Sequence, residues 1–352
     1  MSQAPPLRIA MLVPPWYELP PRGYGGLELV VAQLIDALVA RGHHVTLFGA
    51  GTRTGTGAEF VSTVPQPQHA RLGMGMPELV HVARADTLID AGAFDVVHDH
   101  TDAGLLTAPR RRAATIATVH GCPTGELANY LSCVDPGVAL VAISHAQRRL
   151  GVGLPWTATV HNGLRVTGPV KSWPSSGPAL WLARFNPDKG PDLAIRACRA
   201  AGVPLVLAGK ATEPGEREYL DVVIKPMLHP DVRLLVNPGA RECRRLLAGA
   251  RCLILPVRWE EPFGMVMIEA MAAGTPVVAL NRGAVPELVR HGETGIVCAG
   301  PEELPDAVHA AREVDPRACA RHVRTSFSAE LMAQRYEQVY RAWAGTRPAR
   351  AA

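Results

Sequence analysis

The sequence predicts an α/β protein made of two Rossmann-like domains, on three observations. The chain has 352 residues, and a single hydrophobic core stops growing near roughly 250–300 residues. Short apolar runs alternate with amphipathic stretches, which is typical of parallel βαβ units with helices on both faces of a sheet. The alternation breaks once, where residues 162–178 are rich in glycine, proline, serine and lysine, and then restarts.

The first half contains one clear helix among short strand-like runs. From Gly26 to Arg41 apolar residues recur every three or four positions, and Gly42 is a natural end for this helix. The apolar runs are continuous, as in strands that are buried on both faces. They are Arg8–Val13, His44–Phe48, Phe94–His98, Thr115–Val119, Val138–Ile143 and Thr159–His161. We assign residues 1–165 to an N-terminal domain.

A linker over residues 166–178 precedes a second domain over 179–328, which repeats the same alternation. The expected strands are Ala179–Ala183, Leu205–Ala208, Val232–Val236, Cys252–Leu255, Pro276–Leu280 and Ile296–Cys298. The clearest helices are Asp192–Ala201, Glu216–Met227 and Phe263–Ala273. A last helix within 329–345, from Ala329 to Trp343, is expected to pack back toward the N-terminal domain, and 346–352 form a frayed tail. Two such domains would face each other across a cleft, the default ligand site.

Composition excludes several functions. Apolar residues make up 47% and charged residues 19% of the chain, which is too apolar for disorder. A net charge of +4 falls far short of the basic excess of a nucleic-acid binder. No apolar run approaches the ~18 residues of a membrane span, and the first residues lack a basic leader, so we expect a cytoplasmic protein without a secretory signal. Oligomeric state stays open.

Metal and disulfide sites are not expected. The seven cysteines are scattered without a C-x-x-C pair, which argues against a disulfide framework or a cysteine zinc site. His98 and His100 form an H-x-H pattern with His120 downstream, but no fixed carboxylate or cysteine accompanies them. The N-terminal domain holds no lysine and as many arginines as acidic residues, so an anionic ligand fits the second half better. We interpret Arg110–Arg112 as a solvated loop.

The segment Trp259–Pro276 carries the strongest chemical signal. It follows an apolar strand, Pro262 fits the first turn of a helix and Gly274 fits its end. A helix that begins there offers unpaired amides and a positive dipole to a phosphate group. Glu261 and Glu269 are eight positions apart, which is about 12 Å of helical rise, whereas glycosidase carboxylates lie about 5–9.5 Å apart. The pair suits two acceptors on a long polyhydroxylated ligand.

The pattern E-P-F-G-x4-E-A-M-A-x-G-T-P-V-V in this segment resembles the retaining glycosyltransferases of family 4, which have the GT-B fold. Further matches extend the resemblance over nearly the whole chain. They are Tyr24-Gly25-Gly26-x-Glu28, Arg41-Gly42-His43, Asp95–His98, Thr118-Val119-His120-Gly121, His161-Asn162-Gly163 and Ala183-Arg184-Phe185-x-Pro187-x-Lys189-Gly190. The proline-rich segment Pro14–Gly26 is similar to an actinobacterial subset of the family with members in antibiotic biosynthesis.

The resemblance implies a role for each matching residue. Arg184 and Lys189 would neutralise the donor diphosphate, Glu269 would accept from the ribose hydroxyls, and Glu261 from the donor sugar. His120 would touch the transferring sugar or orient the acceptor; a satisfied core histidine is the alternative. The remaining donor-binding groups are the backbone at Gly25, Gly26, Phe263, Gly264 and Met265, where glycine lets the chain approach the diphosphate.

The resemblance thus implies a metal-independent, retaining transferase without cofactor, which moves a sugar from a UDP or GDP donor to a hydroxyl of a soluble or secondary-metabolite acceptor. A sugar-nucleotide epimerase, a glycoside phosphorylase and a non-catalytic nucleotide-sugar-binding protein are the alternatives. A nicotinamide dehydrogenase fits poorly, because Thr54 stands where the third glycine of a dinucleotide fingerprint belongs after Gly49 and Gly51.

Overall fold

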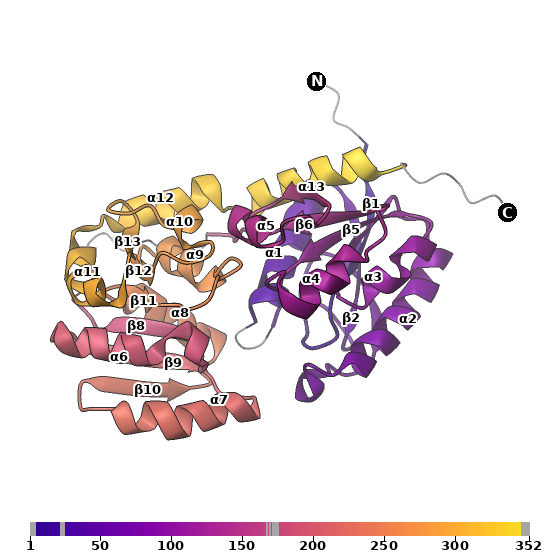
Figure 1. Cartoon of the computed structure of the whole chain (residues 1–352). Helices are drawn as coiled ribbons and strands as arrows, with labels where there is room; N and C mark the ends of the chain where they lie inside the picture. Colours follow the sequence, from indigo (N-terminus) through magenta and orange to yellow (C-terminus); the bar gives the residue numbers. More distant parts are fainter. Residues whose placement is uncertain (1–4, 22–24, 167, 169, 171–175, 346–352) are drawn as a thin grey trace. The chain divides into compact units, whose positions relative to one another are not determined.

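The computed structural model describes residues 5–21, 25–166, 168, 170 and 176–345, which form two compact units. The first unit contains the chain up to Pro21, Gly25–Gly163 and the segment from Ala329 onward; the second contains Leu164–Ser328. Each unit is a parallel sheet with helices on both faces (Figure 1), which confirms the expected α/β architecture. Tyr24, most of the linker over 166–178 and the tail over 346–352 lie outside the described residues.

The sheet of the first unit has seven parallel strands in the order β3-β2-β1-β4-β5-β6-β7. They are β1 Arg8–Leu12, β2 His44–Ala50, β3 Glu59–Val64, β4 Val96–Asp99, β5 Ala114–Val119, β6 Val138–Ala142 and β7 Trp156–Thr159. Strands β4, β5 and β6 are buried along their whole length, which explains their unbroken apolar runs. Strand order reverses between β1 and β4, a position where open α/β sheets bind ligands at the carboxyl ends of the strands.

The α-helices in the described part of this unit are α1 Gly26–Ala40, α2 Gly75–Ala91, α3 Gly104–Thr107, α4 Gly125–Ser132, α5 His145–Leu150 and α13 Ala329–Trp343. The expected helices over Gly26–Arg41 and Ala329–Trp343 are confirmed. Strand β3 and helix α2 were not predicted from the sequence. Only two of the six residues of the edge strand β3 are buried, and α2 carries apolar residues on its exposed face as well as on its buried one, so neither shows a clean period.

Helix α13 packs on the first unit, as expected. Its buried Tyr336 and Tyr340 reach the sheet, where the Tyr336 hydroxyl lies 2.8 Å from Thr118 Oγ1. The carboxylate of Glu337 forms an ion pair with Arg41 at the end of α1. The C-terminal helix is therefore part of the core of the first unit.

The second unit has six parallel strands in the order β10-β9-β8-β11-β12-β13. They are β8 Ala179–Arg184, β9 Leu205–Lys210, β10 Val232–Val236, β11 Leu253–Leu255, β12 Val277–Leu280 and β13 Gly295–Cys298. Its helices are α6 Pro191–Ala200, α7 Pro214–Tyr219, α8 Ala240–Gly249, α9 Met265–Ala272, α10 Val285–Leu288, α11 Leu304–Ala310 and α12 Pro316–Ser326.

Three expectations about local structure are wrong. The helix predicted over Glu216–Met227 is α only to Tyr219; a π turn and a 3₁₀ turn follow, because Pro226 cannot continue an α-helical hydrogen-bond ladder. The strand expected over Thr159–His161 is β7, which already ends at Thr159. In the expected solvated loop Arg110–Arg112, Arg111 is buried between two carboxylates, 2.7 Å from Asp99 and 2.8 Å from Asp86.

None of the seven cysteines, which all lie among the described residues, forms a disulfide bond, and five of them are buried. Within the part of the chain that the structure describes, no helix is both long and apolar enough to cross a membrane.

Candidate functional site

The segment between β11 and α9 lies at the carboxyl end of the second sheet. Gly264 directly precedes α9 and has a φ angle of +93°, in the left-handed region that favours glycine. The helix therefore begins at Met265, and the prediction that Pro262 lies in its first turn is wrong. Because Glu261 precedes the helix, its separation from Glu269 does not follow from helical rise, and the estimate made on that basis does not apply.

Glu261 is the centre of a buried ion pair. Its Oε2 atom accepts hydrogen bonds from the Lys189 ammonium and from Trp259 Nε1, the latter at 2.9 Å. The Lys189 nitrogen also lies 4.5 Å from the centroid of the Trp259 ring, in cation–π geometry. The Lys189 side chain is 15% and the Glu261 side chain 10% exposed. The structure thus joins two of the residues that the sequence analysis selected.

Local backbone geometry places Lys189 next to this segment. Lys189 ends a 3₁₀ turn, and Gly190 follows in the left-handed region with a φ angle of +64°. A Cβ atom on Gly190 would lie 2.2 Å from the carbonyl oxygen of Pro256, so only glycine lets the two loops approach this closely. The indole of Trp181 donates to the Lys189 carbonyl at 2.9 Å.

Arg258 ties the same two loops together. Its guanidinium binds both carboxylate oxygens of Asp192 at 2.7 Å and donates to the Pro187 carbonyl at 2.9 Å. Burial alone would raise the pKa of Asp192, but the hydrogen bonds and charge of Arg258 lower it below its usual value. Asp192 stays ionised, so the clamp that supports Lys189 persists at neutral pH.

Arg184 has carboxylate partners of its own. It ends β8, its side chain is 45% exposed, and its guanidinium lies 3.6 Å from Glu213 and 3.5 Å from Glu216. Glu216 is buried and caps α7 together with Glu213. Neither acidic neighbour was predicted from the sequence.

Glu269 lies on α9 and is partly exposed. Burial raises the pKa of its carboxyl to about 7, against the opposing effect of the Arg244 charge. Burial also raises the pKa of the Cys243 thiol to about 11, and the charge of Glu269 adds to the effect. Glu269 is therefore close to the first turns of α8, on which Cys243 lies.

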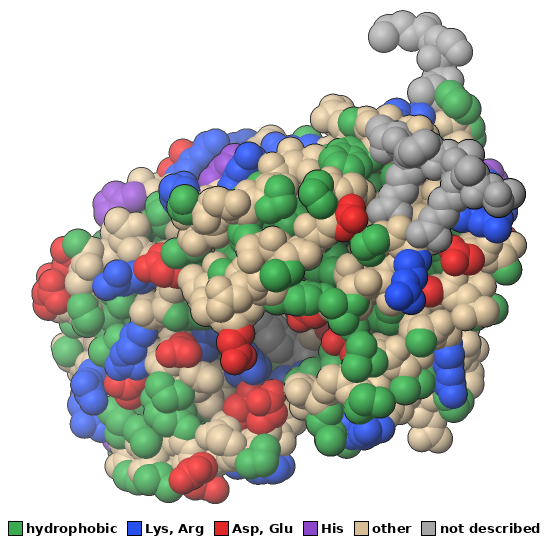
Figure 2. Space-filling view, turned by 45° about the vertical axis from the view of Figure 1, so that its right-hand side comes forward, with side chains coloured by type: hydrophobic (Ala, Val, Ile, Leu, Met, Phe, Trp, Pro, Cys, Tyr) green, Lys and Arg blue, Asp and Glu red, His purple; other side chains and the backbone are tan. Residues whose placement is uncertain are grey.

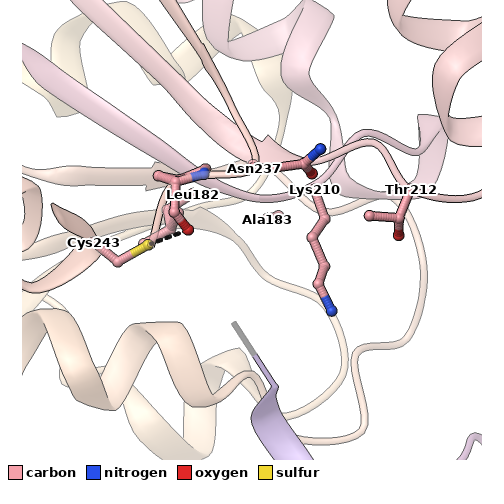
Figure 3. A pocket seen from close by; sticks show the side chains of 8 residues that line it. Leu182, Ala183, Lys210, Thr212, Asn237 and Cys243 are labelled. Carbon is pink, nitrogen blue, oxygen red and sulfur yellow. Dashed lines mark hydrogen bonds between the residues drawn. The ribbon is translucent and has the colours of Figure 1, made fainter. Parts of the chain in front are cut away.

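A pocket of about 440 Å³, including its open mouth, lies at the carboxyl ends of β8, β9 and β10 (Figure 3). Asn237 stands just after β10 with a φ angle of +54°, and its Oδ1 atom accepts from the Ala211 amide at 3.0 Å. The Lys210 side chain extends away from the strand ends (Figure 3). The lining residues are Leu182, Ala183, Gly209, Lys210, Thr212, Asn237, Pro238 and Cys243.

None of the residues that line this pocket was predicted as a site residue from the sequence. The tripeptide Asn237-Pro238-Gly239 directly after a predicted strand was a usable signal, because turn residues at a carboxyl strand end shape ligand sites in such sheets. Lys210 pairs in register with Arg184, so the topology sets two cations side by side on neighbouring strands.

In the first unit, Gly25 directly precedes α1. A Cβ atom on Gly25 would lie 2.8 Å from Oε2 of the buried Glu28 and 3.2 Å from Pro21. Gly26 is the first residue of α1. Both glycines thus lie where the chain enters a helix at the carboxyl edge of β1.

His120 follows β5, and its Nε2 atom lies 2.9 Å from Nδ1 of the buried His100. Burial lowers the pKa of His120 to about 4, and burial lowers the pKa values of His98 and His100 well below their usual value. All three imidazoles are therefore neutral at pH 7.

Comparison with known proteins supports one class. Residues 24–136 match the model described as "Glycosyltransferase Family 4", and residues 178–316 match "Glycosyl transferases group 1". A glycogen synthase of Mycobacterium tuberculosis is 27% identical over 88% of this chain and 87% of its own. A phosphatidyl-myo-inositol mannosyltransferase of Mycobacterium leprae is 28% identical over 84% of each chain.

Solved structures agree with this assignment. AviGT4, a glycosyltransferase involved in avilamycin A biosynthesis, superposes with a TM-score of 0.75 at 26% identity and covers 97% of this chain and 99% of its own. Anabaena HepE in complex with UDP and glucose gives a TM-score of 0.71 at 19% identity over 96% of this chain and 100% of its own, a likeness of fold. Fold and matched domains define a glycosyltransferase with the GT-B fold. More specifically, the two matched domains and the likeness to AviGT4 support a GT4-type glycosyltransferase.

Proposed function

We propose that this enzyme transfers a sugar, with retention of anomeric configuration and without a metal ion, from a UDP or GDP donor to an acceptor hydroxyl. The buried Lys189–Glu261 pair before the first turn of α9 carries the proposal. It sets a cation beside helix amides that have no partner inside the helix. Charge that builds on a departing diphosphate needs such preorganised donors.

The chemistry follows from these groups. The bond between the anomeric carbon and the phosphate oxygen breaks with its electron pair on the diphosphate, which Lys189 and the backbone amides of Phe263, Gly264 and Met265 stabilise. The acceptor oxygen bonds to the same face of the anomeric carbon, and its proton passes to the leaving phosphate. The Oε1 atom of Glu261 has no hydrogen bond among the described residues, so it accepts from a sugar hydroxyl.

Arg184 supplies a second cation. At 45% exposure and 3.5–3.6 Å from two carboxylates, it exchanges the exposed Glu213 for a phosphate oxygen when the donor binds. The exposed Arg184–Glu213 pair contributes about 0–1 kcal/mol, less than the roughly 1.5–3 kcal/mol of a charge-assisted hydrogen bond to phosphate. Gly25 and Gly26 let the chain approach the diphosphate without a Cβ atom.

The nucleoside fits the pocket beside Asn237. The pocket lies at the carboxyl ends of β8, β9 and β10, where open α/β sheets bind their ligands. Glu269 is close to Cys243, which lines this pocket, so its carboxylate is suited to accept from the ribose hydroxyls. Burial already raises the pKa of the Glu269 carboxyl to about 7, and a ribose hydroxyl would take the place of solvent beside it.

For the acceptor we propose a small secondary metabolite with an apolar portion. Five apolar side chains, each 40–61% exposed, cluster at the start of α2: Leu72, Met74, Met76, Leu79 and Val80. Neighbouring exposed apolar side chains of this kind mark a binding surface on a monomer. Glu78 in the same turn accepts from the Asp102 amide at 3.0 Å, so the patch adjoins the carboxyl end of β4.

Charge argues against an anionic membrane surface as the occupant of this patch. Basic and acidic side chains are interspersed over the face shown in Figure 2. Within residues 71–81, which include the patch, Arg71 is the only lysine or arginine, whereas membrane attraction needs a cluster of about 4–8 basic residues. The likeness to AviGT4 supports an acceptor from antibiotic biosynthesis. Leu79→Asp together with Met76→Asp should raise the KM for such an acceptor and leave donor hydrolysis unchanged; equal KM values for wild type and variant would refute this assignment.

A thermal-shift panel of nucleoside diphosphates, followed by assays with the matching donor sugars, tests the proposed function. We expect UDP or GDP to raise the melting temperature and the donor to release its diphosphate, slowly with water and faster with an acceptor; α-linked product from an α-linked donor shows retention. Release of a sugar phosphate only with added inorganic phosphate would indicate a phosphorylase. Sugar isomerisation without diphosphate release would indicate an epimerase, and binding without turnover a non-catalytic protein.

A further inference from the structure

Three histidines form a continuous row of rings in the first unit. His98 lies in β4, His100 follows the same strand, and His120 follows the neighbouring β5. The ring centroids of His98 and His100 are 4.0 Å apart, and those of His100 and His120 are 5.2 Å apart. The row begins in the core and ends at His120, which is partly exposed.

The bonding pattern determines which nitrogen of each ring carries a proton. His100 Nε2 lies 3.2 Å from the sulfur of Met11. A thioether sulfur has lone pairs and no proton to give, so His100 Nε2 is the donor. Since His100 is neutral, its Nδ1 atom has a lone pair and must accept from His120 Nε2. A neutral His120 then carries a bare lone pair on Nδ1, which has no hydrogen-bond partner among the described residues.

The backbone on both sides of His120 is also fixed. The amide nitrogen of the buried Gln147 side chain donates to the carbonyls of Val119 and Gly121, at 2.8 Å each. The side-chain oxygen of Gln147 accepts from the Ile143 amide at 2.8 Å, and its backbone amide donates to Ser144 Oγ at 2.9 Å. The ring of His120 is thus oriented by His100 and its backbone by Gln147.

The C-terminal helix supports the inner end of the row. His98 Nδ1 lies 2.7 Å from the hydroxyl of Tyr340, and His98 Nε2 lies 2.7 Å from Thr118 Oγ1. Tyr340 and Tyr336 come from α13. These contacts hold the ring of His98, which in turn contacts His100.

We propose that His100 is a positioning residue: it keeps His120 protonated on Nε2, so that Nδ1 of His120 accepts a hydrogen bond from a hydroxyl of the bound sugar substrate. The contact with sugar rests on the function proposed above. The tautomer itself is a property of the free protein, so the two parts can be tested separately.

Nitrogen NMR of the full chain with ¹⁵N-labelled histidine tests the first part. We expect His120 to be protonated on Nε2 in the wild type. His100→Phe keeps a ring beside His98 but removes the acceptor, so it should shift His120 toward the other tautomer or a mixture. His100→Asn offers an oxygen near the position of Nδ1 and should restore the wild-type form. A wild-type His120 protonated on Nδ1, or an unchanged tautomer in His100→Phe, would overturn the proposal.

Kinetics and titration test the second part. We expect His100→Phe to lower kcat/KM at least tenfold and His100→Asn to recover most of it. His81→Phe is the matched control, because it replaces a buried histidine of the same unit outside this row; it should cost stability with kcat/KM unchanged. Donor sugar nucleotide, but not UDP or GDP alone, should shift His120 Nδ1. A donor that binds by thermal shift and leaves this resonance unmoved would overturn the substrate contact, whereas no binding at all would refute the proposed function instead.

Discussion

Replacing Lys189 by methionine should weaken the binding of the donor diphosphate. Lys189 contacts Glu261 and the face of Trp259, and the two charged side chains are largely buried, at 15% and 10% exposure. A charge-assisted hydrogen bond to the diphosphate is worth roughly 1.5–3 kcal/mol, so UDP or GDP affinity should fall about 10- to 150-fold at about 1.4 kcal/mol per decade. Methionine keeps the apolar stem of lysine, so the packing over Trp259 is largely retained.

The partner substitution Glu261→Gln should have a different effect. Glutamine still accepts from Trp259 Nε1 but no longer neutralises Lys189, which leaves the full ammonium charge to the diphosphate. We therefore expect the affinity for the free nucleoside diphosphate to be unchanged or up to about tenfold higher, while turnover of the sugar donor falls because the acceptor for a sugar hydroxyl is weaker. Calorimetry with the diphosphate and single-turnover assays with the donor measure the two effects independently.

The control for both substitutions is Lys225→Met, which removes a 52% exposed lysine paired with Asp221 one helical turn away. It should leave affinity and turnover unchanged. Breaking a buried ion pair can cost about 3–5 kcal/mol of stability, so each variant is compared at a temperature well below its own unfolding transition. A folded Lys189→Met variant that binds the diphosphate as tightly as the wild type would refute the assigned role of this lysine.

Three further predictions concern stability. Folding raises the pKa of Glu269 from 4.5 to about 7, so the charge of its carboxylate increasingly disfavours the folded state as pH rises from 4.5 to 7. Glu269→Gln should therefore be up to about 3 kcal/mol more stable than the wild type at pH 8, equally stable below pH 4.5, and weaker in nucleotide binding. A stability difference between the two proteins that stays constant across this pH range would contradict the prediction. Gly190→Ala should lower the free energy of unfolding by about 2–4 kcal/mol, measured by chemical denaturation. Gly202 is also left-handed but has no atom within 4 Å of a new Cβ, so Gly202→Ala should lower it by only about 1 kcal/mol. Equal losses would show that backbone strain alone matters. Arg111→Met should cost about 3–5 kcal/mol by leaving the buried carboxylate of Asp99 unpaired, and a loss below about 1 kcal/mol, the range of an exposed pair, would contradict a buried one.

The buried strands of both sheets could be predicted because a strand that is buried on both faces consists of a continuous run of apolar residues. Residues 138–142 form β6 and are apolar throughout, since both faces of a central parallel strand are covered. The edge strand β3 is partly exposed and mixes polar with apolar residues, so its sequence looks like a loop. The start of α9 was misplaced for another reason: Gly264 adopts the left-handed conformation directly before the helix, and a proline followed two residues later by a glycine does not show which of the two begins the helix.

In the candidate site, too, some residues could be selected from local sequence motifs, whereas others are brought together only by the fold. Lys189-Gly190 and the E-P-F-G segment could be selected from sequence because each is a short motif with a backbone requirement. The acidic partners of Arg184 could not, because Glu213 and Glu216 follow the next strand along the chain and meet it only through strand register and the cap of α7. Lys210 was missed likewise, since only the pairing of β8 with β9 sets it beside Arg184.

The tautomer of His120 depends on residues that are far from it in the sequence. A sequence pattern can mark a histidine at a strand end, but an imidazole in that position can present either a proton or a lone pair. Here the choice is made by the sulfur of Met11, 89 positions before His100 in the chain, and it is transmitted through one hydrogen bond to His120. A leucine at position 11 would fill similar volume and leave His100 free to turn its proton toward His120. The identity of a buried, apolar strand residue therefore determines whether His120 can accept a hydrogen bond from a hydroxyl.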